Sequence, residues 1–204
     1  ALPPPAVARK AAAVGAAKAH LDLVSTFALA VLAGAFIALG AAFATTVLAG
    51  SSALPYGVAR LLGGLAFSLG LILVVIAGAE LFTGNNLLVM AWADRKITLA
   101  ELLRNWLLVY FANAAGACGL AAVVYLSHHA DMNQGAVGLA YLKIAAAKTA
   151  MPFAEAFFKG VLCNLLVCLA VWIALAGHSV TDKVIAIIFP ISAFVAAGFE
   201  HSVA

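Results

Sequence analysis

The sequence has very little charge. Of its 204 residues, 9% are Asp, Glu, Lys or Arg, whereas 66% are apolar, and the mean hydropathy is +1.14. A water-soluble domain of this size needs far more polar surface to cover itself. The composition therefore excludes that class and indicates the lipid bilayer as the solvent. The small net charge of +3 is scattered along the chain, so no nucleic-acid partner is predicted.

Cysteine and metal-ligand patterns are also scarce. Only three cysteines occur, all within apolar runs: Cys118, Cys163 and Cys168. Packed thiols are the ordinary outcome there, so a disulfide framework is not expected. His128 and His129 precede Asp131, but adjacent histidines in a polar loop are more often solvated, and no His-Glu-x-x-His spacing occurs. We therefore predict no metal, no cofactor and no enzymatic activity.

Long apolar runs dominate the rest of the chain. A membrane-crossing helix needs about 20 residues, so the length allows roughly five spans in one bundle. We place them at residues 23–49, 58–79 with a short continuation at 87–93, 99–126, 152–176 and 181–197. Residues 1–22 are too basic to span, and they predict an amphipathic helix lying at the membrane interface. A short helix ending near Lys148 is expected in the polar connection at 128–150.

Two of the apolar runs break in the same way. Gly78-Ala79-Glu80 ends one run and Gly198-Phe199-Glu200 ends another, about 120 residues later. Matched interruptions are typical of inverted-repeat transporters, whose site lies between two broken helices. Irregular backbone at membrane depth must line protein or a cavity, and half-helix N-termini favour an anion. The alternative, that each break is an ordinary loop between spans, stays open.

The residues at these breaks resemble the formate–nitrite transporter family over residues 22–204. The strongest matches are FSLGL at 67–71, AGAELFTGN at 77–85, NW at 105–106, KGVLCN at 159–164 and GFEHSVA at 198–204. The resemblance implies an all-α integral membrane fold: a homopentamer of aquaporin-like inverted-repeat protomers, with broken second and fifth transmembrane helices. It also implies a transmembrane channel domain over residues 23–204. A sixth helix is missing from this sequence, and we expect the natural chain to continue beyond Ala204 into it.

The resemblance also implies site residues, position by position. His201 would be the central pore histidine, and Thr83 would lie on a mobile loop near the cytoplasmic constriction. Lys148 and Asn164 would lie along the anion path. Hydrophobic constrictions would be formed by Phe67, Leu71, Phe82 and Phe194.

Each of these roles has a plainer alternative. An ionisable side chain at membrane depth usually faces a cavity, and imidazole exchanges protons near neutral pH, but His201 could instead bond only to backbone. Thr83 could cap a short helix, and Lys148 could be a snorkelling surface lysine. Without the resemblance, the four constriction residues would be ordinary core residues.

The two glutamates of the breaks are expected to be structural. An anion path gains nothing from a bare carboxylate, so Glu80 and Glu200 should turn aside and accept hydrogen bonds from backbone N–H groups of the breaks. Gly84, Asn85 and Gly198 belong to the same loop-structural set.

The resulting functional hypothesis is transmembrane transport of small monovalent anions, formate first and nitrite second, by a channel or a proton-linked transporter. Hydrosulfide or short monocarboxylates are alternative substrates. A pore for water or small neutral solutes shares the architecture, but its paired Asn-Pro-Ala signature is absent. Seven basic residues against four place the N-terminus in the cytoplasm. We expect a multi-pass protein of the bacterial inner membrane.

Overall fold

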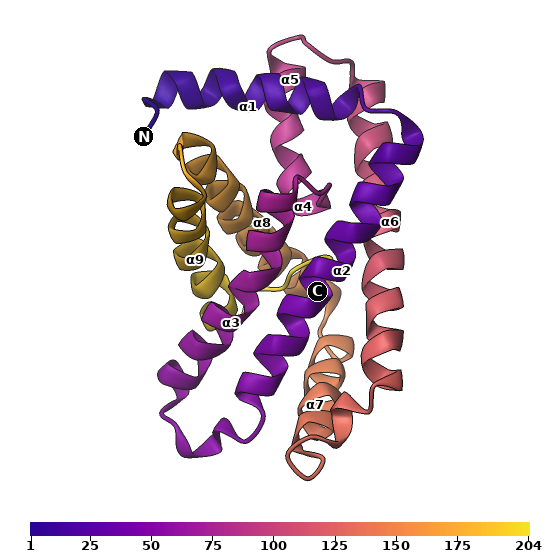
Figure 1. The fold of residues 1–204 in the computed structure, drawn as a ribbon, viewed down its shortest axis with the longest axis vertical. Coiled ribbons are helices and arrows are strands. Elements are labelled where there is room, and N and C mark those ends of the chain that lie inside the picture. Colours follow the sequence, from indigo (N-terminus) through magenta and orange to yellow (C-terminus); the bar gives the residue numbers. More distant parts are fainter.

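Every regular element in the computed structural model, which describes residues 1–204, is a helix (Figure 1). Five helices are long and apolar enough to cross a membrane: α2 (Leu23–Leu48), α3 (Tyr56–Ala77), α6 (Leu99–Leu126), α8 (Phe153–Ala176) and α9 (Val180–Ala197). They agree with the predicted spans to within two residues at each end. The remaining elements are α1 (Pro4–Ala19), α4 (Phe82–Asn85), α5 (Val89–Ala93), α7 (Ala136–Thr149) and the 3-10 turns Ser51–Ala53, Asn86–Leu88 and His129–Asp131.

Local sequence explains where the spans begin. Asp22 caps α2, because its carboxylate accepts a hydrogen bond from Ser25 N–H at 2.9 Å. Thr98 and Glu101 form a capping box at the start of α6, and Ser179 and Asp182 form another at the start of α9. The helices α3 and α8 begin directly after prolines, which cannot extend a helix backwards.

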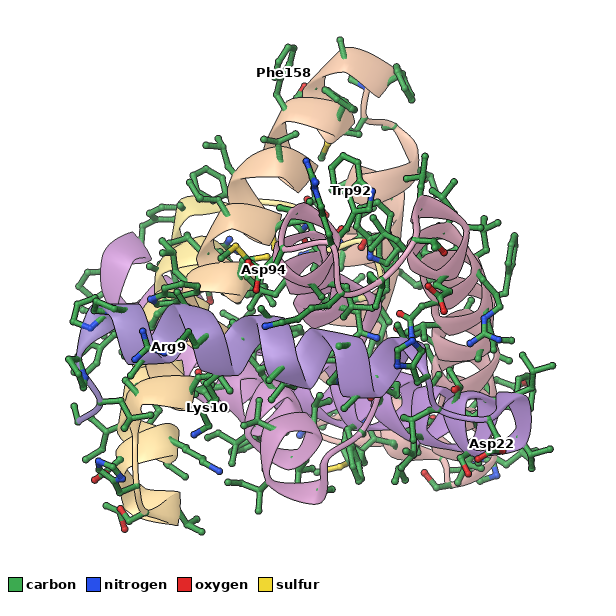
Figure 2. The ribbon with its side chains drawn as sticks, turned by 90° about the horizontal axis from the view of Figure 1, so that it is seen from above. Arg9, Lys10, Asp22, Trp92, Asp94 and Phe158 are labelled. Carbon is green, nitrogen blue, oxygen red and sulfur yellow. The ribbon has the colours of Figure 1, made fainter.

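The helix α3 runs through the centre of the bundle. It packs against α2 on one side and α9 on the other, while α2 also packs against α6 and α8 packs against α9. The largest buried cluster surrounds α3 and includes Ile37, Leu71, Ile187 and Phe194. Large apolar side chains elsewhere point outward; Phe158 of α8 projects away from the bundle in Figure 2. This outward apolar surface suits contact with lipid.

The two shorter helices α1 and α7 lie at opposite ends of the bundle (Figure 1). The helix α1 lies across the ends of the spans. The face of α1 that is buried against them carries Val7, Ala11, Gly15 and Ala19. The predicted N-terminal helix therefore exists, and its place at the membrane interface stays a prediction. The predicted short helix before Lys148 and Thr149 is α7.

Candidate functional site

Both breaks begin with a glycine in the left-handed conformation. Gly78 follows α3 with φ 70°, and Gly198 follows α9 with φ 75°. Ala79 N–H then bonds to Val74 C=O at 2.9 Å, and Phe199 N–H bonds to Phe194 C=O at 3.0 Å. These are the six-residue closures of a Schellman-type helix end, in which glycine avoids the penalty of a side chain. The same local chemistry therefore ends both helices.

The first break is shorter than predicted. The interruption was expected to extend over residues 80–86, but helix resumes at Phe82, so Thr83, Gly84 and Asn85 belong to α4 rather than to a loop. The side chain of Asn113 on α6 explains this, because its Oδ1 accepts a hydrogen bond from Phe82 N–H at 2.8 Å. Its amide also donates to the carbonyls of Ala30 and Glu80, at 2.7 and 2.8 Å. A single buried Asn thus satisfies backbone groups of the break and of α2.

His201 lies between the two breaks and is buried. Its Nδ1 accepts a hydrogen bond from Val203 N–H at 3.2 Å, and its Nε2 lies 3.2 Å from the hydroxyl oxygen of Thr83. In the neutral imidazole, an accepting Nδ1 leaves the proton on Nε2, so Nε2 donates to Thr83. The Thr83 side chain does not cap the helix α4. The structure therefore joins the two residues across 118 positions of sequence.

Aromatic rings enclose this histidine. The Phe194 ring stacks on the imidazole with centroids 5.8 Å apart, and the Phe67 ring lies 6.2 Å from it. Phe67 and Phe194 contact each other edge to face at 5.6 Å. Leu71 lies one turn further along α3 and is buried in the same cluster. The structure does not bring Phe82 into this group, because its ring packs against Tyr110 and Trp106 of α6.

The glutamates of both breaks pair with lysines. Glu80 Oε1 accepts from Lys18 Nζ at 2.8 Å, and its Oε2 accepts from the Asn85 amide at 2.7 Å. Glu200 pairs with Lys148 of α7. The expectation that both carboxylates accept backbone N–H groups is therefore wrong. A carboxylate at membrane depth carries a full charge, and an ammonium group compensates it better than a dipole does.

Asn85 holds the first pair in place. Its Oδ1 accepts from Lys18 Nζ at 3.0 Å, its amide lies 3.0 Å from Asn105 Oδ1, and its carbonyl accepts from Trp106 Nε1 at 2.9 Å. Sequence reasoning missed the roles of Lys18, Asn105 and Asn113. The available signal was the presence of polar residues inside apolar or interfacial helices, but their partners lie far apart in sequence.

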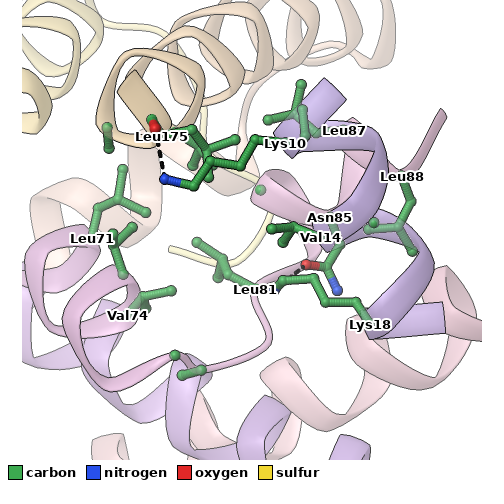
Figure 3. Close-up of a pocket in the computed structure, with 18 of the residues that line it drawn as sticks. Lys10, Val14, Lys18, Leu71, Val74, Leu81, Asn85, Leu87, Leu88 and Leu175 are labelled. Atoms are coloured by element: carbon green, nitrogen blue, oxygen red, sulfur yellow. Dashed lines mark hydrogen bonds between the residues drawn. The ribbon is translucent and has the colours of Figure 1, made fainter. Parts of the chain in front are cut away.

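A cavity of about 310 Å³ lies between α1 and the first break (Figure 3). Leu71, Val74 and Leu81 form part of its apolar wall, and Gly84 and Asn85 also line it. Three lysines reach it from two helices: Lys10, Lys18 and Lys183. Lys10 crosses the cavity edge to bond Leu175 C=O at the end of α8, at 2.9 Å. The cavity is therefore apolar in the wall nearest Leu71 and cationic towards α1.

Lys148 and Asn164 lie near the second break. Lys148 Nζ bonds both to Glu200 and to Ala204 C=O, at 3.2 Å for the latter. Gly160, one turn before Asn164 on α8, faces the Glu200 backbone. The Asn164 Oδ1 atom is buried without a hydrogen-bond partner. An unpaired buried acceptor is costly unless something else satisfies it.

Comparison with known proteins identifies the family of this chain. The sequence pattern of the Formate/nitrite transporter family matches residues 5–204. The chain belongs to the formate/nitrite transporter family. It is 44% identical over 201 residues to the formate channel FocA of Escherichia coli K12, covering 98% of this chain and 70% of that protein. It is also 44% identical over 187 residues to FocA of Haemophilus influenzae, covering 92% of this chain and 66% of that protein.

Solved structures of this family agree with the fold. A structure described as a pentameric formate channel with formate bound matches with a TM-score of 0.83 and 46% identity, over 88% of this chain and 70% of that one. An FNT family ion channel matches with a TM-score of 0.87 and 32% identity, over 98% and 79%. The predicted family and the all-helical, multi-pass membrane fold are confirmed. The chain is a membrane transport protein and not an enzyme.

Proposed function

We propose that this protein moves formate across the bacterial inner membrane, with nitrite as its second substrate, as a homopentamer with one path in each protomer. The observation that carries the proposal is the buried His201–Thr83 pair, held between two matched helix breaks and enclosed by Phe67 and Phe194. The names of the relatives support the choice of formate and of five subunits, since they describe a formate channel and a pentameric formate channel.

The proposed path enters at the cavity beside α1. Lys10 and Lys183 attract the anion to this end, which becomes the cytoplasmic side under the positive-inside rule. The path then passes Leu71 and reaches the constriction of Phe67 and Phe194 beside His201. Lys148 draws anions at the opposite mouth. In this proposal Phe82 supports α6 rather than narrowing the path, because its ring packs on Tyr110.

The proposed mechanism follows from the cost of burying charge. An unpaired anion between apolar rings loses its hydration, whereas a neutral acid loses much less. Formic acid is about as acidic as an Asp side chain, near pKa 4, so at pH 7 roughly one molecule in a thousand is neutral. His201 either hydrogen-bonds the anion or protonates it for passage as the acid. The free Asn164 amide oxygen is then available to accept the acid's O–H.

The two lysine–glutamate pairs support this mechanism. Each carboxylate near a break is matched by one ammonium group, so neither break adds net negative charge that would repel the substrate. The remaining lysines of the cavity, Lys10 and Lys183, keep its potential positive.

Uptake of labelled formate into proteoliposomes tests the function. We expect formate entry above that of protein-free vesicles, competition by nitrite, and loss of proton-linked flux in His201→Ala. An electroneutral, pH-driven flux indicates acid passage, whereas a flux that responds to voltage by about 2.3 kcal/mol per charge per 100 mV indicates the bare anion. Water permeability without formate flux would instead support a pore for neutral solutes.

A further inference from the structure

The end of α9 is held by a residue of α3 that the proposed path does not include. Arg60, in the second turn of α3, donates from Nη2 to Val195 C=O and from Nε to Ala196 C=O, the latter at 3.4 Å. These carbonyls belong to the last turn of α9, directly before Gly198. Val195 C=O also accepts a hydrogen bond from Gly198 N–H at 3.2 Å, whereas Ala196 C=O has no backbone donor, because the chain turns out of the helix at this glycine. A guanidinium fork is suited to bridging two such acceptors.

Three contacts define how α3 and α9 lie against each other. Arg60 meets Ala196, Gly64 meets Ser192, and Ser68 Oγ lies 3.5 Å from Ile188 C=O. Each step of four residues forward on α3 is a step of four residues backward on α9. The two helices are therefore antiparallel and in register over two turns, with Arg60 at one end of the contact. At Gly64 a Cβ atom would lie 2.7 Å from Ser192 Cα, so the backbones touch there.

The same register sets the aromatic enclosure of His201. Phe67 is one residue before Ser68, and Phe194 is one residue before Val195, whose carbonyl Arg60 holds. The 5.6 Å separation of these two rings therefore depends on α9 staying in place along α3. Arg60 also forms no ion pair with an acidic side chain. Its bonding partners are two main-chain carbonyls.

We propose that Arg60 is a positioning residue for anion selection: it locks the last turn of α9 onto α3, and so sets the gap between Phe67 and Phe194 beside His201. This inference rests on the proposed transport of small anions. If the lock loosens, α9 shifts against α3, the rings separate, and the constriction discriminates less by size. The expected consequence is a change in the ratio of the flux of a small anion to that of a larger one, and not a loss of folding alone.

The test compares Arg60→Gln, Arg60→Lys and Lys143→Gln with the wild-type protein. Lys143 is an exposed residue of α7 with no bonded partner, so its substitution removes one positive charge without touching α9. Formate and lactate uptake are measured in proteoliposomes, together with amide hydrogen exchange over residues 194–203. We expect Arg60→Gln to lower the formate-to-lactate flux ratio several-fold and to speed exchange in that segment. Arg60→Lys should fall between, and Lys143→Gln should match wild type.

Two results overturn the proposal. One is a wild-type flux ratio with wild-type exchange in folded Arg60→Gln. The other is an equal loss of both fluxes with an unchanged ratio, which would limit Arg60 to folding. If Arg60→Gln does not fold, Arg60→Lys is compared with the wild-type protein in its place. A lysine cannot bridge both carbonyls as the guanidinium group does, so the proposal still requires a lower formate-to-lactate flux ratio. A wild-type protein that carries no formate contradicts the proposed function, while the exchange comparison still decides whether Arg60 holds α9.

Discussion

Lys18 Nζ lies 2.8 Å from Glu80 Oε1, and this contact joins the helix α1 to the first break. The second break repeats it, since Lys148 of α7 pairs with Glu200. In both cases the glutamate follows a left-handed glycine by two residues, and the lysine comes from the short helix that precedes a span. The two halves of the chain therefore use the same device, with the lysines supplied by α1 and α7 from opposite ends of the bundle.

Breaking the first of these pairs should destabilise the protein. The Lys18→Met variant leaves the Glu80 carboxylate, which is 2% exposed, without its cation. Loss of one partner of a buried pair costs about 3–5 kcal/mol, and the partial exposure of Lys18 places the expected loss towards the lower value. Thermal unfolding in detergent measures it, and the double variant Lys18→Met/Glu80→Gln should recover much of the loss.

The Lys96–Asp94 pair provides the control, because both side chains are well exposed. Lys96→Met should change stability by less than about 1 kcal/mol. Equal effects of Lys96→Met and Lys18→Met would contradict the account of Glu80 as a buried, compensated charge.

The contact between Thr83 and His201 gives a second prediction. Thr83→Val keeps the side-chain volume but removes the hydroxyl that meets Nε2, whereas Thr83→Ser keeps the hydroxyl. We expect Thr83→Val to lose about 0.5–1.5 kcal/mol of stability, the usual net worth of one hydrogen bond. It should also shift the pH profile of formate uptake, because imidazole protonation is no longer coupled to the hydroxyl. A wild-type profile in Thr83→Val, with Thr83→Ser altered, would count against the pair.

The cap of α2 predicts a pH dependence. The Ser25 N–H bond holds the pKa of Asp22 below its ordinary value of 3.8. A lowered pKa in the folded state means that the cap contributes stability above pH 3.8 and loses it as pH falls through the lowered value. In Asp22→Asn the amide keeps a capping oxygen but does not titrate. The stability difference between the two proteins should therefore change only in the acid range, as followed by helical circular dichroism.

The apolar runs and the residues that interrupt them were enough to predict the five long helices. Apolar length located five helices, and in the structure Asp22, Pro55, Thr98 and Pro152 directly precede four of them. The matched glycines also predicted both breaks. These features are local, because each depends on residues within one or two turns of one another.

The side-chain partners within the site could not be found in this way. Asn113 shortens the first break by capping Phe82 from another span, and Lys18 reaches Glu80 across 62 residues. Phe82 belongs to a motif of the family and was expected to form a constriction, yet its ring packs against Tyr110 of α6. Periodicity assigns a residue to a helix face, but it does not say which distant side chain meets it. Such contacts depend on how the helices pack.

The glycine at the second break provides the last prediction. Gly198 has φ 75°, and a Cβ atom there would meet only Arg60 Nη2, at 3.7 Å, which is ordinary contact. Gly198→Ala should therefore cost about 1–2 kcal/mol through backbone strain alone. Gly119, in the exposed face of α6 with open space around it, is the matched control, and Gly119→Ala should stabilise by about 0.5–1 kcal/mol. Opposite signs in thermal unfolding confirm that the left-handed turn, and not side-chain volume, requires glycine at the break; equal signs would contradict it.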